Sequence, residues 1–157
     1  MPITVILREM RMKIRIGFVS NSSSTSFTIT SAPSYIVPPW PSHIVPNEEF
    51  GRCTFGWDRE EIWDIGSRVI WAYLQSRYSK DIGWQQMLEE VIKENSEVKQ
   101  IDWSRLDELY NHAEAYIDHQ SCYAETGDPV IFETALALKD FIFGKNSYIQ
   151  VSNDNDY

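Results

Sequence analysis

A run of hydroxyl and amide side chains near the start of the chain is the first candidate for chemistry. It consists of Ser20, Asn21, Ser22, Ser23 and Ser24. Consecutive N–H groups and hydroxyls in a tight connection can hold a phosphate or another anion. The run lacks the Gly-x-x-x-x-Gly-Lys-Ser/Thr pattern of a phosphate loop, and it leads into a strand pattern where phosphate loops lead into a helix. It predicts an anion- or ligand-binding turn, with a purely structural turn as the alternative.

The pair Asp118-His119 is a second candidate, for catalytic proton transfer. A histidine acts as a general base when a carboxylate orients it, and either Asp118 or Asp154 could do so. If a helix continues through Ser121, the two neighbouring side chains diverge by about 100°. If the helix ends near Ile117, the side chains can converge in the following loop. The structural alternative is that Asp118 and Gln120 bond the helix end and neighbouring loops.

The acidic stretch near the end of the printed sequence offers oxygen ligands for a hard cation. Asp154 and Asp156 alternate there with Asn153 and Asn155. The glycine and the distal glutamate of a calcium loop are missing. We expect these aspartates to be the metal ligands if a metal is bound, and a solvated terminal segment is the alternative.

Histidine and cysteine side chains provide two further patterns. On one helical stretch, Glu108, His112 and His119 fall along one edge, where the histidines could share a metal or form a solvated polar flank. The two cysteines, Cys53 and Cys122, are expected to be reduced and partly buried thiols. No pattern identifies a particular cofactor.

Aromatic residues are unusually frequent. Six Trp, eight Tyr and seven Phe make up 13% of the chain. Most are expected in the core, because aromatic side chains bury large areas. A tryptophan left at the surface would indicate a protein partner, since such side chains dominate binding energy. Trp40 and Trp57 are the candidates for that role.

The net charge of −9 argues against direct nucleic-acid binding, which requires clustered lysine and arginine. Only Arg8, Arg11, Lys13 and Arg15 approach a cluster. An acidic face that occupies a basic partner surface remains open. No signal peptide and no membrane span is recognisable, so we expect a cytoplasmic protein with a host or phage protein as its partner.

Two short strand patterns flank the serine run. Ile14, Ile16 and Phe18 alternate with polar residues, as do Phe27 and Ile29, which predicts a hairpin with these side chains on one face. Residues 32–49 contain five prolines around Trp40 and predict an extended connector that the tryptophan holds down.

Helical periodicity predicts four helices after the connector. The first is capped by Asp58 and ends near Tyr78, the second covers 84–92, the third runs from Asp102 to Ile117, and the fourth extends from Asp128-Pro129 to Gly144. Residues 148–151 form a last strand that rejoins the hairpin. The fold is therefore expected to be α+β: a small antiparallel sheet packed against about four helices.

A chain of 157 residues is expected to form a single domain over residues 1–157. Within it, residues 1–11 form a possible extension, residues 32–49 the Pro-rich connector and residues 152–157 a polar tail.

The segment from Lys13 to Ile29 resembles the opening of a loose group of small bacteriophage and bacterial proteins. Two later pieces are also similar to that group: Asp118-His119-Gln120-Ser121, and parts of the stretch from Phe141 to Asp156. Together they cover roughly a quarter of the chain. The chain departs from the group in Thr25 and in the residues ahead of Met12, where relatives begin. The resemblance implies a phage or prophage origin and no particular activity.

Three functions are compatible with these patterns. The first is a phage-encoded accessory protein that binds a host or phage macromolecule, as in host takeover or anti-defence. The second is a small hydrolase or nucleotide- or anion-binding enzyme, in which the serine run, Asp118-His119 and the Asp154 region form one site. The third is a structural component of a virion. We expect the first, because the chain is small, acidic and rich in aromatic residues.

Overall fold

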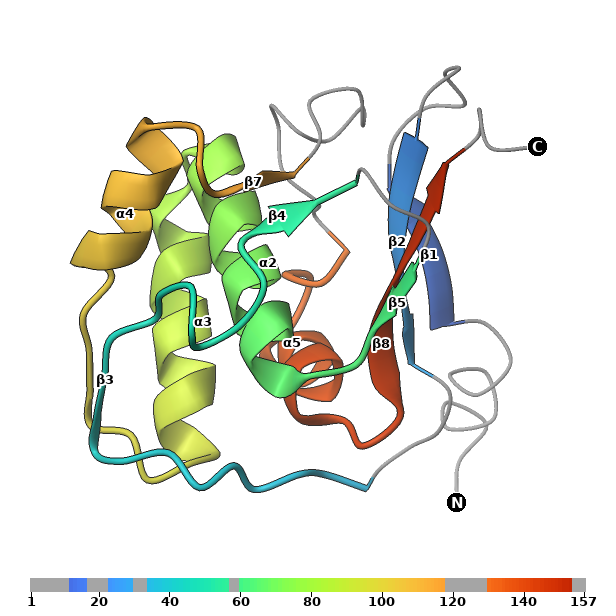
Figure 1. The fold of residues 1–157 in the computed structure, drawn as a ribbon. Helices are drawn as coiled ribbons and strands as arrows, with labels where there is room; N and C mark the ends of the chain where they lie inside the picture. Colours follow the sequence, from blue (N-terminus) through green and yellow to red (C-terminus); the bar gives the residue numbers. More distant parts are fainter. Residues whose placement is uncertain (1–11, 17–22, 30–33, 57–59, 118–129, 154–157) are drawn as a thin grey trace.

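The computed structural model describes residues 12–16, 23–29, 34–56, 60–117 and 130–153. A four-stranded sheet stands at one side of the molecule, and the described helices all lie on the other side (Figure 1). The fold is α+β, as expected from the sequence. The elements in chain order are β1 (Met12–Ile16), β2 (Ser23–Ile29), β3 (His43–Ile44), β4 (Thr54–Phe55), β5 (Glu60–Ile62), α2 (Ile65–Ser79), α3 (Ile82–Glu94), β6 (Gln100–Ile101), α4 (Ser104–Asn111), β7 (Tyr116–Ile117), α5 (Ala135–Phe143) and β8 (Ser147–Asn153).

The large sheet has the strand order β1-β2-β8-β5, and every pairing in it is antiparallel. This confirms the predicted hairpin and the return of the last strand to it. The register aligns Ile14 with Phe27, Phe27 with Ile149, and Ile149 with Ile62. Ile149 and Ile62 are buried, so these two residues of β8 and β5 mark the face of the sheet that meets the core. Phe18 lies outside the described residues.

The first predicted helix starts later than its pattern indicates. Glu60–Ile62 form the edge strand β5, and α2 begins at Ile65 with Asp64 as its N-cap. The Asp64 carboxylate accepts bonds from the Ser67 N–H at 3.0 Å and the Ser67 hydroxyl at 2.6 Å. The prediction of a cap at Asp58 was wrong, because pairing with β8 draws the preceding residues into the sheet.

The third predicted helix is shorter than expected. α4 ends at Asn111, and Ala113 then takes a positive φ of 58°. Tyr116 and Ile117 form β7, which pairs in parallel with β4. Asp102 does contribute at the other end, since its carboxylate accepts a bond from the Ser104 N–H at 2.9 Å. The helical stripe continued in the sequence, but a left-handed residue and a strand pairing end the helix.

The fourth predicted helix ends at Gly144 as expected, but it does not begin at Asp128-Pro129. α5 starts at Ala135, and the Thr134 hydroxyl accepts a bond from the Ala137 N–H at 3.0 Å. The second predicted helix is confirmed as α3.

The Pro-rich connector wraps around the helices and contains no helix in its described part. Figure 1 shows it passing beneath the helices and then beside α3. Trp40 holds it to the core as predicted, because the Trp40 ring lies 5.1 Å from the Phe50 ring and 6.2 Å from the Phe143 ring, measured between centroids. Farther along, β3 pairs in parallel with β6.

Candidate functional site

The last two residues of the serine run, Ser23 and Ser24, belong to β2. Ser23 lies opposite Asn153, and Ser24 lies opposite Ser152, in the β2–β8 pairing. The prediction that these two serines belong to a turn was therefore wrong, and the predicted polar tail begins inside β8. The reason is tertiary: β8 supplies backbone partners that override the turn preference of serine. Ser20, Asn21 and Ser22 lie outside the described residues.

In the alternative enzyme site, the serine run and the Asp154 region adjoin two strands that pair with each other. The register sets the first described residue of β2 beside the last described residue of β8, Ser23 beside Asn153. Asp118-His119, Asp154 and Asp156 lie outside the described residues, so their predicted roles stay predictions.

The long third helix on which a metal edge was predicted is not observed. α4 ends at Asn111 with His112 as its C-cap, and His119 lies outside the described residues. His112 is exposed, with Nδ1 2.8 Å from the Glu108 carbonyl oxygen, and the Glu108 carboxylate bonds Arg105. Within the described ranges, no group of three or more His, Cys, Asp or Glu side chains is arranged to hold a metal ion.

Cys53 is buried and has the properties of a structural thiol. Its Sγ lies 3.7 Å from the Gly51 carbonyl oxygen. Burial, and secondarily the negative charge of Glu48, raises the pKa of the Cys53 thiol to about 11. The thiol therefore stays protonated at neutral pH, whereas a nucleophilic cysteine requires a lowered pKa.

The structure places Trp40 at the core and a different tryptophan at the surface. Trp40 is half-buried against its aromatic neighbours, and Trp57 lies outside the described residues. Trp63, which follows β5, is 47% exposed and is the one exposed aromatic residue in the described part of the chain. Its ring stacks on the Tyr148 ring with centroids 4.2 Å apart and planes 21° apart.

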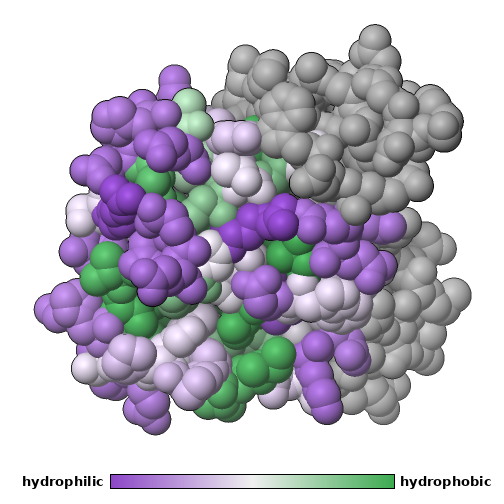
Figure 2. All heavy atoms as spheres, in the orientation of Figure 1, coloured by the Kyte–Doolittle hydropathy of each residue, from purple (hydrophilic) through white to green (hydrophobic). Residues whose placement is uncertain are grey.

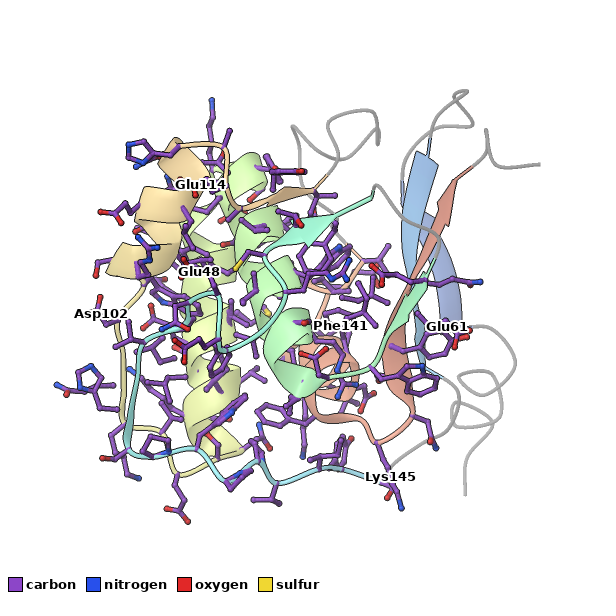
Figure 3. All side chains as sticks on the ribbon, viewed as in Figure 1. Glu48, Glu61, Asp102, Glu114, Phe141 and Lys145 are labelled. Atoms are coloured by element: carbon purple, nitrogen blue, oxygen red, sulfur yellow. The ribbon has the colours of Figure 1, made fainter. Side chains whose placement is uncertain are left out.

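We call Trp63, Tyr148 and Glu61 the Trp63 patch. The Trp63 indole N–H donates to the Glu61 carboxylate at 3.2 Å, which fixes the ring from one end while Tyr148 supports its face. Glu61 is labelled in Figure 3, where it projects from β5 at the sheet. Both Glu61 and the neighbouring Asp64 are exposed. The patch is thus an oriented aromatic surface flanked by negative charge.

Trp63 was not predicted as a site residue, because it fell inside the first predicted helix, away from its apolar stripe. The available signal was period-two spacing: Glu61 and Trp63 alternate with Ile62, as in a half-buried strand. Elsewhere on the visible face, hydrophilic residues cover most of the described surface and the hydrophobic areas are small and separate (Figure 2).

Comparison of the chain with protein-family models, curated proteins and solved structures found no match. Among the helices of the described ranges, none combines the length and the apolar character that crossing a bilayer requires.

Proposed function

We propose that this protein is a phage-encoded accessory protein that binds a protein of the host or the phage through the Trp63 patch, in the cytoplasm of an infected bacterial cell. The observation that carries the proposal is the half-exposed Trp63 ring stacked on Tyr148. The resemblance of the serine segment to small phage proteins supports the biological setting.

A tryptophan in this arrangement suits an interface anchor. Tryptophan and tyrosine are enriched among the residues that dominate protein–protein binding energy. The Trp63 ring is held by its stacking on Tyr148 and by its bond to Glu61. A side chain already fixed in one rotamer loses little further freedom on binding, which favours affinity.

The charge around the patch indicates a basic partner surface. Glu61 and Asp64 are exposed beside Trp63, and the whole chain carries a net charge of −9. Opposite charge on the partner would accelerate association at low salt, and salt would reduce that acceleration.

The test is affinity capture from lysate of a bacterial host with the tagged full chain and its Trp63→Ala variant. The matched control is Leu136→Ala, which truncates a side chain of similar exposure, 51%, on α5. We expect one basic protein to be captured by the parent and by the control, and to be lost with Trp63→Ala. Loss of one aromatic stack costs only about 0.5–1.5 kcal/mol, so the variant should stay folded by circular dichroism.

Capture that is unchanged by Trp63→Ala would contradict the proposal. Trp40→Ala and Trp57→Ala belong in the same experiment, because both were predicted as anchors from the sequence. A loss restricted to Trp57→Ala would transfer the anchor role to that residue.

A small hydrolase or nucleotide- or anion-binding enzyme is the second candidate. The adjacency of Ser23 and Asn153 favours it, since it brings the serine run and the Asp154 region to the same end of two paired strands. In this case the same purified protein would carry a nucleotide or a metal ion, detectable by native mass spectrometry, and would capture no partner.

A further inference from the structure

A cleft of about 420 Å³ opens where the end of α2, the start of α3 and the last turn of α4 meet. These helix ends lie at the upper left of Figure 1. The volume falls in the range of small-molecule sites. None of the lining residues belongs to the Trp63 patch, so the cleft is a separate candidate. The lining residues that matter here are Arg77, Lys80, Asp81, Ile82 and Tyr110.

Arg77 is held in position by an aromatic and an acidic neighbour. Its Cζ lies 4.7 Å from the centroid of the Tyr110 ring. Its Nη1 is 3.7 Å from Asp107 Oδ1, which is too long for a hydrogen bond, and the Tyr73 hydroxyl donates to that oxygen at 2.5 Å. Arg77 Nε is buried and has no hydrogen-bond partner among the described residues. A guanidinium oriented on an aromatic face in this way matches the fork geometry of a carboxylate.

Lys80 adds a second cation from an unusual backbone position. It is the C-cap of α2 with a φ of 58°, and its N–H donates to the Arg77 carbonyl. Glycine or asparagine usually occupies this position, because a Cβ makes the left-handed conformation costly. The lysine is exposed, and its ammonium group lines the cleft. Glycine at this position would favour folding more.

Two cations and two carboxylates meet at the cleft. Arg77 and Lys80 stand against Asp81, and Asp107 forms an ion pair with Arg77 at 3.7 Å from outside the lining. The Asp81 carboxylate is already engaged, since it accepts a bond from the Gly83 N–H at 2.8 Å. Ile82 is 72% exposed and adds apolar surface to the same lining.

We propose that this cleft binds the carboxylate of an organic acid that carries an apolar group. Arg77 and Lys80 bind the carboxylate, and the apolar group lies against Ile82. A free small acid and the C-terminal carboxylate of a peptide both supply this chemistry.

The test is a titration of the ¹⁵N-labelled full chain followed by backbone amide chemical shifts. The probes are N-acetyl-leucine, its uncharged amide, 4-methylpentanoate and the peptide acetyl-Gly-Gly-Leu. We expect saturable shifts centred on residues 76–85 with the three acids and none with the amide. Stronger binding of the peptide or of 4-methylpentanoate identifies the source. Equal shifts with the amide, or no saturable shift with any acid, would overturn the proposal.

Variants separate the cleft from general charge effects. Arg77→Lys keeps the charge and removes the fork, so affinity should fall about tenfold. Lys80→Asn removes the cation with a residue that tolerates the left-handed region, so affinity should fall several-fold while the melting temperature holds or rises. Lys99→Asn is the matched control, because Lys99 is exposed and lies outside the cleft lining. Equal losses in all three variants would refute the assignment.

Discussion

Arg68 carries its guanidinium into the interior of the protein at 0% exposure. Nη1 donates to the Gly144 carbonyl at 2.9 Å and to the Ser147 carbonyl at 2.7 Å. Burial lowers the pKa of Arg68 to about 10, so the side chain is still charged at neutral pH. Its charge lies at the C-terminal end of α5, where the helix dipole favours a cation. The residue thereby ties α2 to the turn between α5 and β8.

We expect Arg68→Ala to lower the free energy of unfolding by about 2–4 kcal/mol, because two buried carbonyls lose a charged donor and a cavity remains. Urea unfolding measures the change. Lys145→Ala is the control, since Lys145 is exposed beside the same turn, and it should stay within about 0.5 kcal/mol. A parent-like midpoint for Arg68→Ala would show that the turn does not depend on this contact.

At the scale of elements, the start of α2 decides where β5 ends. Asp64 caps the helix through the Ser67 N–H and hydroxyl, and the Ser67 hydroxyl in turn accepts a bond from the Arg52 N–H at 2.7 Å. One carboxylate therefore stabilises both the helix and the chain that precedes the sheet edge.

Asp64→Ala should lower the free energy of unfolding by about 1–2 kcal/mol, as is typical of a lost N-cap. Asp64→Asn should recover most of this loss, because asparagine also caps helices. Chemical denaturation of the three proteins checks the order. An alanine variant as stable as the parent would mean that the cap contributes nothing.

The sequence predicted elements well where side-chain periodicity and structure coincide, and less well where pairing partners decide. Alternation around Ile14 and Phe27 identified the hairpin, and Gly144 marked the end of α5. The helical stripe ran through Ile62 and Ile117, yet both residues lie in short strands. Their partners, β8 and β4, are distant in sequence, and periodicity carries no information about them.

For the candidate sites too, composition and periodicity were informative only where no distant pairing partner decided the structure. Serine composition indicated a turn, whereas Ser23 and Ser24 pair with β8. Trp63 lay off the apolar stripe of the predicted helix, but its stacking on Tyr148 of β8 depends on a strand that is distant in sequence. The Arg77 cleft depends on three helix ends meeting, which one sequence does not specify.

For the whole molecule, stability should fall at alkaline pH. Burial raises the pKa of Cys53 to about 11 and, as the main cause, also raises the pKa values of Tyr73 and Tyr78. An acid with a raised folded pKa is deprotonated first in the unfolded chain, so the stabilisation is present below the unfolded pKa and is lost above it. For Cys53 the loss begins near the model-peptide value of about 8.5–9. The pKa of Arg68 is lowered, so its titration raises the stability of the fold, but only above about pH 10.

Urea unfolding at pH 8 and pH 10 under reducing conditions checks the contribution of Cys53. Relative to Cys53→Ala, the parent should lose about 1 kcal/mol over this interval. Cys122→Ala is the control for the other thiol, and it should be compared with the parent in the same buffers. A constant difference between the parent and Cys53→Ala would contradict the buried, protonated thiol.

The position of β8 has a consequence for biosynthesis. In chain order it comes after every other strand of the large sheet, yet it lies between β2 and β5. A ribosome makes the hairpin and β5 well before the strand that joins them, and a two-stranded hairpin is at best marginally stable alone. The sheet therefore forms only once the Ser147–Asn153 segment has left the exit tunnel. Until then, the edges of β2 and β5 are open to pairing with other nascent chains, which makes this interval the period of greatest need for a chaperone.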